Sequence, residues 1–160
     1  ELHCPESHNL SVFARGLANR LRDIETIFVY GDVMEKRCLA LLSILASKAG
    51  DQSTADILQK AVDRTLDIHT PFEQGWVYYP EQKGKTSLKT IAALIAKDYR
   101  GVAVADGRDA SLQYYWVLNG FPDGTYPTKH QQKSTLKNIE QYSRADTANL
   151  YQIWNVLARL

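Results

Sequence analysis

The chain is poor in the residues and patterns that mark specialised protein classes. Its 160 residues include two cysteines and one methionine, and 19 lysines and arginines nearly balance 18 aspartates and glutamates. No apolar run approaches the roughly 20 residues that span a bilayer, so we expect no membrane-spanning helix. The near-neutral charge argues against the basic surface that nucleic-acid binding needs, so we expect no nucleic-acid partner.

Common catalytic and cofactor motifs are also missing. The sequence has no glycine-rich phosphate loop, no HExxH, no paired CxxC and no GxSxG. The four histidines are His3, His8, His69 and His130, and none lies at metal-ligand spacing with a carboxylate or thiol on one helix face. We therefore expect no metal and no cofactor, and we favour a protein that is not an enzyme.

Length and composition indicate a single globular domain over residues 1–160. The hydrophobic fraction is 44% and the charged fraction 23%, both ordinary for a globular protein. A domain of this length buries roughly two-thirds of the surface of its unfolded chain, which is enough to form a core.

The stretch 32–49 predicts the central helix of this domain. Its apolar residues recur at helical spacing on one stripe, which we expect to face the core. Asp32 is well placed to cap the start of this helix. The residues of the stripe are Met34, Cys38, Leu41, Leu42, Leu45 and Ala49.

Similar spacing predicts further helices, and together they indicate an all-α bundle of about seven helices. The other predicted helices cover about 10–29, 54–68, 86–99, 109–121, 134–143 and 147 to near the end. Two short stretches favour strands instead. Residues 26–30 are β-branched and aromatic, and the residues from Gly75 to Pro80 suggest one arm of a small β-hairpin near 75–85.

The two cysteines, Cys4 and Cys38, fit one disulfide in an exported protein. The bond would close a loop of about 35 residues, contribute roughly 3–4 kcal/mol, and tether an N-terminal tail of residues 1–9 to the central helix. The first residues, from Glu1 to Cys4, look like a mature terminus after removal of a signal segment, or like a trimmed chain. We expect a periplasmic or secreted protein; the alternative is two free thiols, with Cys38 in the core.

Aromatic residues gather in and beside two predicted loops, one near 72–79 and one near 114–126. Exposed Trp and Tyr are frequent anchors of protein interfaces and of sugar-binding surfaces, although such residues can also pack beneath loops. If Tyr114 points inward, helical geometry turns Tyr115 or Trp116 outward. The predicted partner-binding residues, anchors and charged rim together, are Trp76, Tyr78, Tyr79, Arg108, Tyr126, Lys129 and His130.

Three functions stay open at this point. The favoured one is an exported, non-catalytic recognition protein of the inhibitor or immunity-protein type, which binds a toxin or an envelope enzyme through loop aromatics. The second is a small hydrolase of glycan or peptidoglycan that uses Glu35 or Glu73 as its acid. The third is a structural subunit of an envelope assembly. A glycan is the alternative ligand to a protein.

Overall fold

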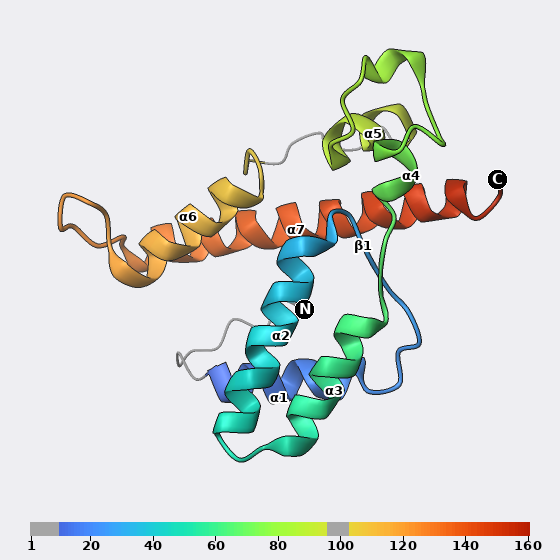
Figure 1. Cartoon of the computed structure of the whole chain (residues 1–160). Coiled ribbons are helices and arrows are strands. Elements are labelled where there is room, and N and C mark those ends of the chain that lie inside the picture. The colour runs from blue at the N-terminus through green and yellow to red at the C-terminus, as the bar shows by residue number, and fades with distance from the viewer. Residues whose placement is uncertain (1–9, 96–102) are drawn as a thin grey trace. The chain divides into compact units, whose positions relative to one another are not determined.

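The computed structural model describes residues 10–95 and 103–160, and the chain divides into two compact units, residues 1–78 and 79–160. Seven α-helices lie within the described ranges (Figure 1). This helical architecture with a small β element confirms the predicted fold class. The assignment of residues 1–160 to one domain stays a prediction.

The N-terminal unit packs three helices against one another: α1 (Leu10–Leu21), α2 (Asp32–Lys48) and α3 (Gln52–Asp63) (Figure 1). Small residues dominate their contact faces. The Ser43 hydroxyl donates a hydrogen bond to the Ala55 carbonyl at 2.9 Å, which links α2 directly to the backbone of α3. The buried residues on these faces are Ala14, Ala18, Leu39, Ser43, Ala46, Ala55, Leu58 and Ala61.

Most of the predicted core stripe of α2 lies on the exposed side of the helix, so the predicted stripe is wrong. Met34, Leu41 and Leu45 are 63%, 50% and 41% exposed. Successive helical residues differ by about 100°, which places Ser43, a residue of the buried face, roughly 180° from Met34. Small residues form the buried face because they let α2 and α3 approach closely. Only Leu42 of the predicted stripe packs against the core.

Cys38 is exposed rather than a core residue, and no disulfide joins it to another cysteine within the described residues. Its predicted partner, Cys4, lies outside the described residues, as does the predicted tail 1–9. The disulfide between Cys4 and Cys38 therefore stays a prediction.

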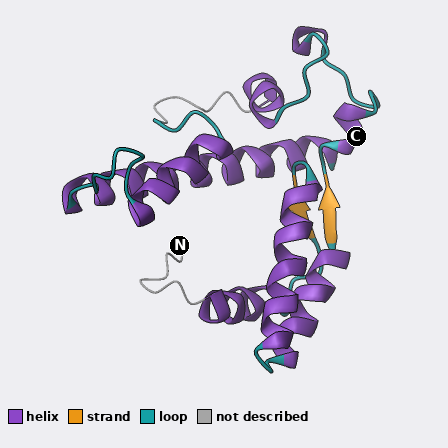
Figure 2. Cartoon of the chain, turned by 60° about the vertical axis from the view of Figure 1, so that its left-hand side comes forward, coloured by secondary structure: helices purple, strands orange, loops and turns teal. Residues whose placement is uncertain are grey.

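Two short strands, β1 (Ile27–Val29) and β2 (Thr65–Asp67), pair in parallel, with Ile27 opposite Thr65 (Figure 2). β1 confirms the strand expected within 26–30, so the first helix is shorter than predicted. β2 occupies residues that were predicted as the end of the third helix.

The two strands form the whole sheet within the described residues, and residues 75–85 do not form the expected hairpin. The backbone N–H groups that would pair across a hairpin instead form local hydrogen bonds. Val77 N–H donates to the Pro71 carbonyl at 3.0 Å, and Tyr79 N–H donates to Gln82 Oε1 at 3.0 Å. Here the chain forms turns and a 3₁₀ helix, η1 (Pro80–Gln82).

Asp67, at the end of β2, joins the two strand ends to the start of α2. Its Oδ1 accepts from the backbone N–H of Gly31 at 2.8 Å and of His69 at 2.9 Å, and its Oδ2 accepts from Asp32 N–H at 3.3 Å. Gly31, at φ 83°, has no side chain to cap the helix. The carboxylate of Asp67 therefore replaces the cap expected from Asp32, which pairs with Lys36. After β2 the short helix α4 (Thr70–Glu73) buries Phe72.

The C-terminal unit is built from α5 (Leu88–Ile95), α6 (Gly107–Asn119) and α7 (Lys129–Leu157), with α5 and α6 both in contact with α7 (Figure 1). Val104, Ile139 and Tyr142 form a buried cluster against which Tyr114 packs. Tyr115 is 58% exposed. This confirms the prediction that Tyr115 points outward if Tyr114 points inward. Residues 96–99, the predicted end of the fourth helix, lie outside the described residues.

α7 is one continuous helix where two were predicted. The break was expected at Asp146 or Thr147, residues that commonly cap helices. In the structure the Thr147 hydroxyl donates to the Ser143 carbonyl at 2.9 Å, and the Ser143 hydroxyl donates to the Ile139 carbonyl at 3.0 Å. Hydroxyls that bond back to the carbonyl four residues earlier are compatible with an uninterrupted helix.

No helix within residues 10–95 and 103–160 combines the length and the apolar character that a bilayer span requires.

Replacing Asp67 with alanine should destabilise the protein by roughly 2–4 kcal/mol, because three backbone N–H groups lose their acceptor. Denaturant unfolding followed by circular dichroism measures the change. Asp63→Ala removes an exposed carboxylate from α3 and should change stability by less than about 0.5 kcal/mol. Equal effects of the two substitutions would contradict the role given to Asp67.

The two faces of α2 should respond in opposite ways to substitution. Leu41→Gln on the exposed face should change the unfolding free energy by less than about 0.5 kcal/mol. Ala46→Leu on the buried face should cost about 1–3 kcal/mol, because the added atoms force α2 away from its neighbours. A larger loss from Leu41→Gln than from Ala46→Leu would show that the predicted stripe is the buried one after all.

Candidate functional site

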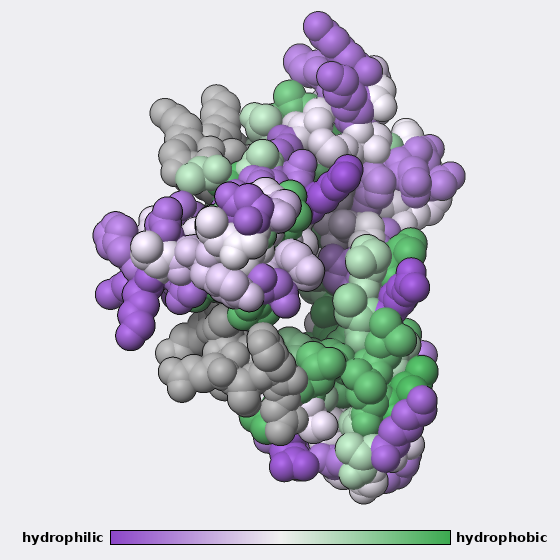
Figure 3. All heavy atoms as spheres, turned by 90° about the vertical axis from the view of Figure 1, so that its left-hand side faces the viewer, coloured by the Kyte–Doolittle hydropathy of each residue, from purple (hydrophilic) through white to green (hydrophobic). Residues whose placement is uncertain are grey.

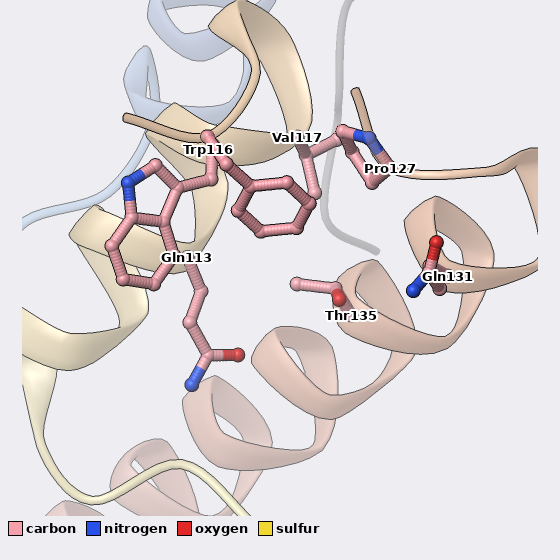
Figure 4. Close-up of a pocket in the computed structure, with 7 residues that line it drawn as sticks. Gln113, Trp116, Val117, Pro127, Gln131 and Thr135 are labelled. Atoms are coloured by element: carbon pink, nitrogen blue, oxygen red, sulfur yellow. The ribbon is translucent and has the colours of Figure 1, made fainter. Parts of the chain in front are cut away.

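A pocket of about 140 Å³ lies in the C-terminal unit, between α6, the loop 120–128 and the first turns of α7 (Figure 4). The lining is apolar apart from three polar side chains, Gln113 on α6 and Gln131 and Thr135 on α7. None of the lining side chains is charged. They are Gln113, Trp116, Val117, Phe121, Pro127, Gln131 and Thr135.

α6 supplies one side of the pocket, because Gln113, Trp116 and Val117 fall at helical spacing on one face. Asp109 fixes the first of these: its Oδ2 accepts from Gln113 Nε2 at 3.1 Å and from Ala105 N–H at 2.8 Å. The Ala105 N–H, followed by the Gln113 amide, holds the pKa of the Asp109 carboxyl below its usual value. The carboxylate therefore stays ionised as an acceptor for Gln113.

The loop 120–128 is closed by its own hydrogen bonds. Phe121 N–H donates to the Thr125 carbonyl at 2.8 Å, and Gly124 N–H donates to the Phe121 carbonyl at 3.0 Å. Asp123 Oδ1 accepts from the Thr125 hydroxyl at 2.7 Å and from Thr125 N–H at 2.9 Å, and these bonds lower the pKa of the Asp123 carboxyl. The loop thus has a defined shape without help from a ligand.

Gly120 lets this loop close against the end of α6. Its φ is 85°, and a Cβ at this position would lie 2.8 Å from the Thr125 carbonyl oxygen and 3.2 Å from Cε1 of Tyr126. The Tyr126 ring therefore lies beside the glycine, while 70% of the residue is exposed. Beside this loop, the rings of Trp116 and Phe121 are 6.0 Å apart, centroid to centroid.

The start of α7 supplies the polar wall through a capping box. Gln131 N–H donates to the Thr128 hydroxyl at 3.3 Å, and Gln131 Oε1 accepts from Thr128 N–H at 2.8 Å. These reciprocal bonds fix the Gln131 side chain as well as the helix start. Thr135 lies one turn later on the same side of α7.

The predicted partner-binding residues on α6, α7 and the loop 120–128 do not form one cluster around the pocket. Tyr126 lies in the loop that borders the pocket. Lys129 and His130 are exposed on α7, but lie roughly 160° and 100° around the helix from Gln131, so they project away from the pocket. Arg108 is exposed at the far end of α6, roughly 16 Å along the helix from Asn119.

The other predicted residues lie after α4. Trp76 and Tyr78 are 74% and 56% exposed at the end of the N-terminal unit, and Tyr79 is half-buried at the start of the C-terminal unit. The partner-binding roles of all seven residues stay predictions.

Sequence reasoning missed the polar wall of the pocket. Thr128 and Gln131 carry the Thr-x-x-Gln pattern of a capping box, which could have placed the start of α7 and one pocket residue. Nothing in the sequence pairs Gln113 with this wall, because that arrangement depends on how α6 lies along α7.

A second exposed surface lies on α2 in the N-terminal unit. Figure 3 shows hydrophobic residues gathered in a green band over this unit. The exposed aliphatic residues of α2 are Val33, Met34, Leu41, Ile44 and Leu45. Apolar patches of this kind are often contact surfaces.

The carboxylates considered for hydrolysis lie elsewhere. Glu35 is in the first turn of α2 and Glu73 is in α4, and both are exposed. Within the part of the chain that the structure describes, no group of three or more His, Cys, Asp or Glu side chains is arranged to hold a metal ion.

Gly120→Ala should destabilise the protein more than Gly124→Ala. Both glycines have positive φ, so each alanine carries a backbone cost of about 1–2 kcal/mol. Only the alanine at Gly120 also meets a backbone oxygen, whereas nothing lies within 4 Å of a Cβ at Gly124. We expect a further loss of about 1–3 kcal/mol for Gly120→Ala in thermal or denaturant unfolding. Equal losses would contradict the close approach of Thr125.

Comparison with known proteins identifies one family. No curated protein and no solved structure matches the chain. A family model described as "Domain of unknown function (DUF2779)" matches residues 3–87, which is just over half of the chain and ends before α5 begins. The pocket lies beyond the matched residues. The chain belongs to the DUF2779 family.

Proposed function

We propose that the protein is a non-catalytic recognition module that binds a partner protein through the surface formed by the pocket and Tyr126. The observation that carries the proposal is an exposed tyrosine on a loop closed by its own hydrogen bonds, beside an uncharged pocket. Tyrosine and tryptophan contribute much of the binding energy at protein interfaces when they fill or border such pockets.

The order of the loop favours binding. A partner that docks on a loop with a defined shape loses little conformational entropy in ordering it. Gly120, Asp123 and Thr125 fix the shape of the loop, and the capping box at Thr128 fixes the helix that follows. The backbone on both sides of Tyr126 is therefore held by these bonds.

The chemistry of the pocket favours recognition over hydrolysis. A glycoside hydrolase needs two carboxyl groups that face one another across its cleft. The pocket residues include none, and Glu35 and Glu73 are exposed on α2 and α4. The role of an assembly subunit is the second candidate, and the observation in its favour is the exposed aliphatic face of α2.

The narrower form of the proposal is an exported protein of the inhibitor or immunity-protein type, with a toxin or an envelope enzyme as partner. Its support is the pair of cysteines and the composition of the chain. The recognition surface itself does not depend on this narrower form.

Tyr126→Ala should weaken binding of the partner by about 30-fold or more, which corresponds to an interface anchor worth roughly 2 kcal/mol. The partner is captured from an envelope extract on the immobilised full chain and purified, and its Kd is measured by calorimetry. Tyr151→Ala is the matched control, because Tyr151 is also an exposed tyrosine, on α7. Its Kd should stay within about twofold of the wild-type value. The proposal would be overturned if every captured protein bound the Tyr126→Ala variant as tightly as it binds the wild-type chain.

A further inference from the structure

Two glutamine side chains flank the pocket, and each has one end held by the protein and one end free. Gln113 uses its Nε2 to donate to Asp109, and Gln131 uses its Oε1 to accept from Thr128. The remaining atoms are the Gln113 Oε1, an acceptor, and the Gln131 Nε2, a donor. Neither has a protein partner within residues 10–95 and 103–160.

Both free atoms face the pocket. In Figure 4 the oxygen of Gln113 and the nitrogen of Gln131 are on the sides of their amide groups nearer to Thr135, which lies between the two glutamines. One acceptor and one donor on opposite sides of a pocket complement a peptide group, which offers one N–H and one C=O. A peptide group in this position would donate to Gln113 and accept from Gln131.

The glutamines are already oriented for this contact. The hydrogen bonds to Asp109 and Thr128 restrict their side-chain rotamers before any ligand arrives. Binding would therefore cost little of the side-chain entropy that freezing a free glutamine normally costs.

The apolar wall selects the side chain that accompanies the peptide group. The pocket volume is about 140 Å³, and its apolar wall consists of Trp116, Val117, Phe121 and Pro127. An apolar cavity that holds benzene has a similar volume, roughly 150 Å³. This space fits one side chain of the size of leucine, methionine or phenylalanine. A charged side chain would lose its hydration without gaining an opposite charge, because no lining residue is charged.

We infer that the pocket binds an extended peptide segment of the partner, holding one uncharged apolar side chain against Trp116 and Phe121 and clamping the adjacent peptide group between Gln113 and Gln131. This inference rests on the proposed function and adds the chemistry of the bound segment.

Two substitutions remove the ligand-facing atoms and keep the internal contacts. Gln131→Glu retains the oxygen that accepts from Thr128, since glutamate also completes a capping box, but loses the donor. Gln113→Lys keeps a donor for the Asp109 carboxylate, which lies four residues earlier on α6. The lysine loses the acceptor oxygen that Gln113 turns toward the pocket. Gln141→Glu makes the same charge change on an exposed part of α7 and serves as the control.

The probe is a random dodecapeptide display library, selected on the immobilised full chain and counter-selected on Thr135→Phe, which fills the pocket. We expect the selected peptides to share one uncharged apolar position. Gln131→Glu and Gln113→Lys should each weaken a selected peptide about tenfold, with an unchanged melting temperature, and Gln141→Glu should not. Measurement in about 1 M salt keeps the introduced charges from dominating the result.

Several results would overturn the inference. One is a selection that enriches no peptide sensitive to Thr135→Phe. Another is peptide binding that survives both glutamine substitutions. A third is a pocket that binds chitin or peptidoglycan oligosaccharides and no peptide, because its ligand would then be a glycan.

Failure of this inference is distinguishable from failure of the proposed function. Partner binding that depends on Tyr126 but not on Gln113 or Gln131 overturns the peptide clamp alone. Partner binding that does not depend on Tyr126 overturns the proposed function.

Discussion

The free backbone N–H groups at helix starts are the constraint on which both units depend. In the N-terminal unit, Asp67 accepts from the N–H groups of the residues just before α2 and α4. Asp51 accepts from Thr54 N–H at 3.2 Å, in the first turn of α3. In the C-terminal unit, Asp106 and Thr128 do the same for α6 and α7. Each unsatisfied group would otherwise weaken the end of its helix.

In the C-terminal unit the same constraint shapes the candidate site. The carboxylate of Asp109, in the first turn of α6, holds Gln113, and the capping box of α7 holds Gln131. Asp109 and the capping box thus orient the two glutamine side chains of the pocket. A substitution at Thr128 would therefore change both the start of α7 and the pocket wall.

The positions of most helices could be predicted from sequence because apolar periodicity is a local property. The buried face of α2 could not, because it was decided by how closely Ser43 and Ala46 let α3 approach. The continuity of α7 was missed because Ser143 and Thr147 can cap a helix or bond back within one, and sequence does not distinguish the two.

The candidate site was predictable only in part. Tyr126 was expected as an exposed aromatic, since it lies among prolines and glycines in a long loop. The pocket beside it depends on the packing of α6 along α7, which brings Gln113 near Gln131, and no local pattern encodes that contact. The family match adds no information about this site, because it ends at residue 87.

The outward-facing aliphatic side chains of α2 have a practical consequence for laboratory work. Dyes that fluoresce on contact with hydrocarbon should adsorb to Val33, Met34 and Leu41 in the native protein, since these side chains are 74%, 63% and 50% exposed. A melting curve recorded with such a dye would begin from a bright baseline and hide part of the transition. Ellipticity at 222 nm, which reports helix content, avoids that background.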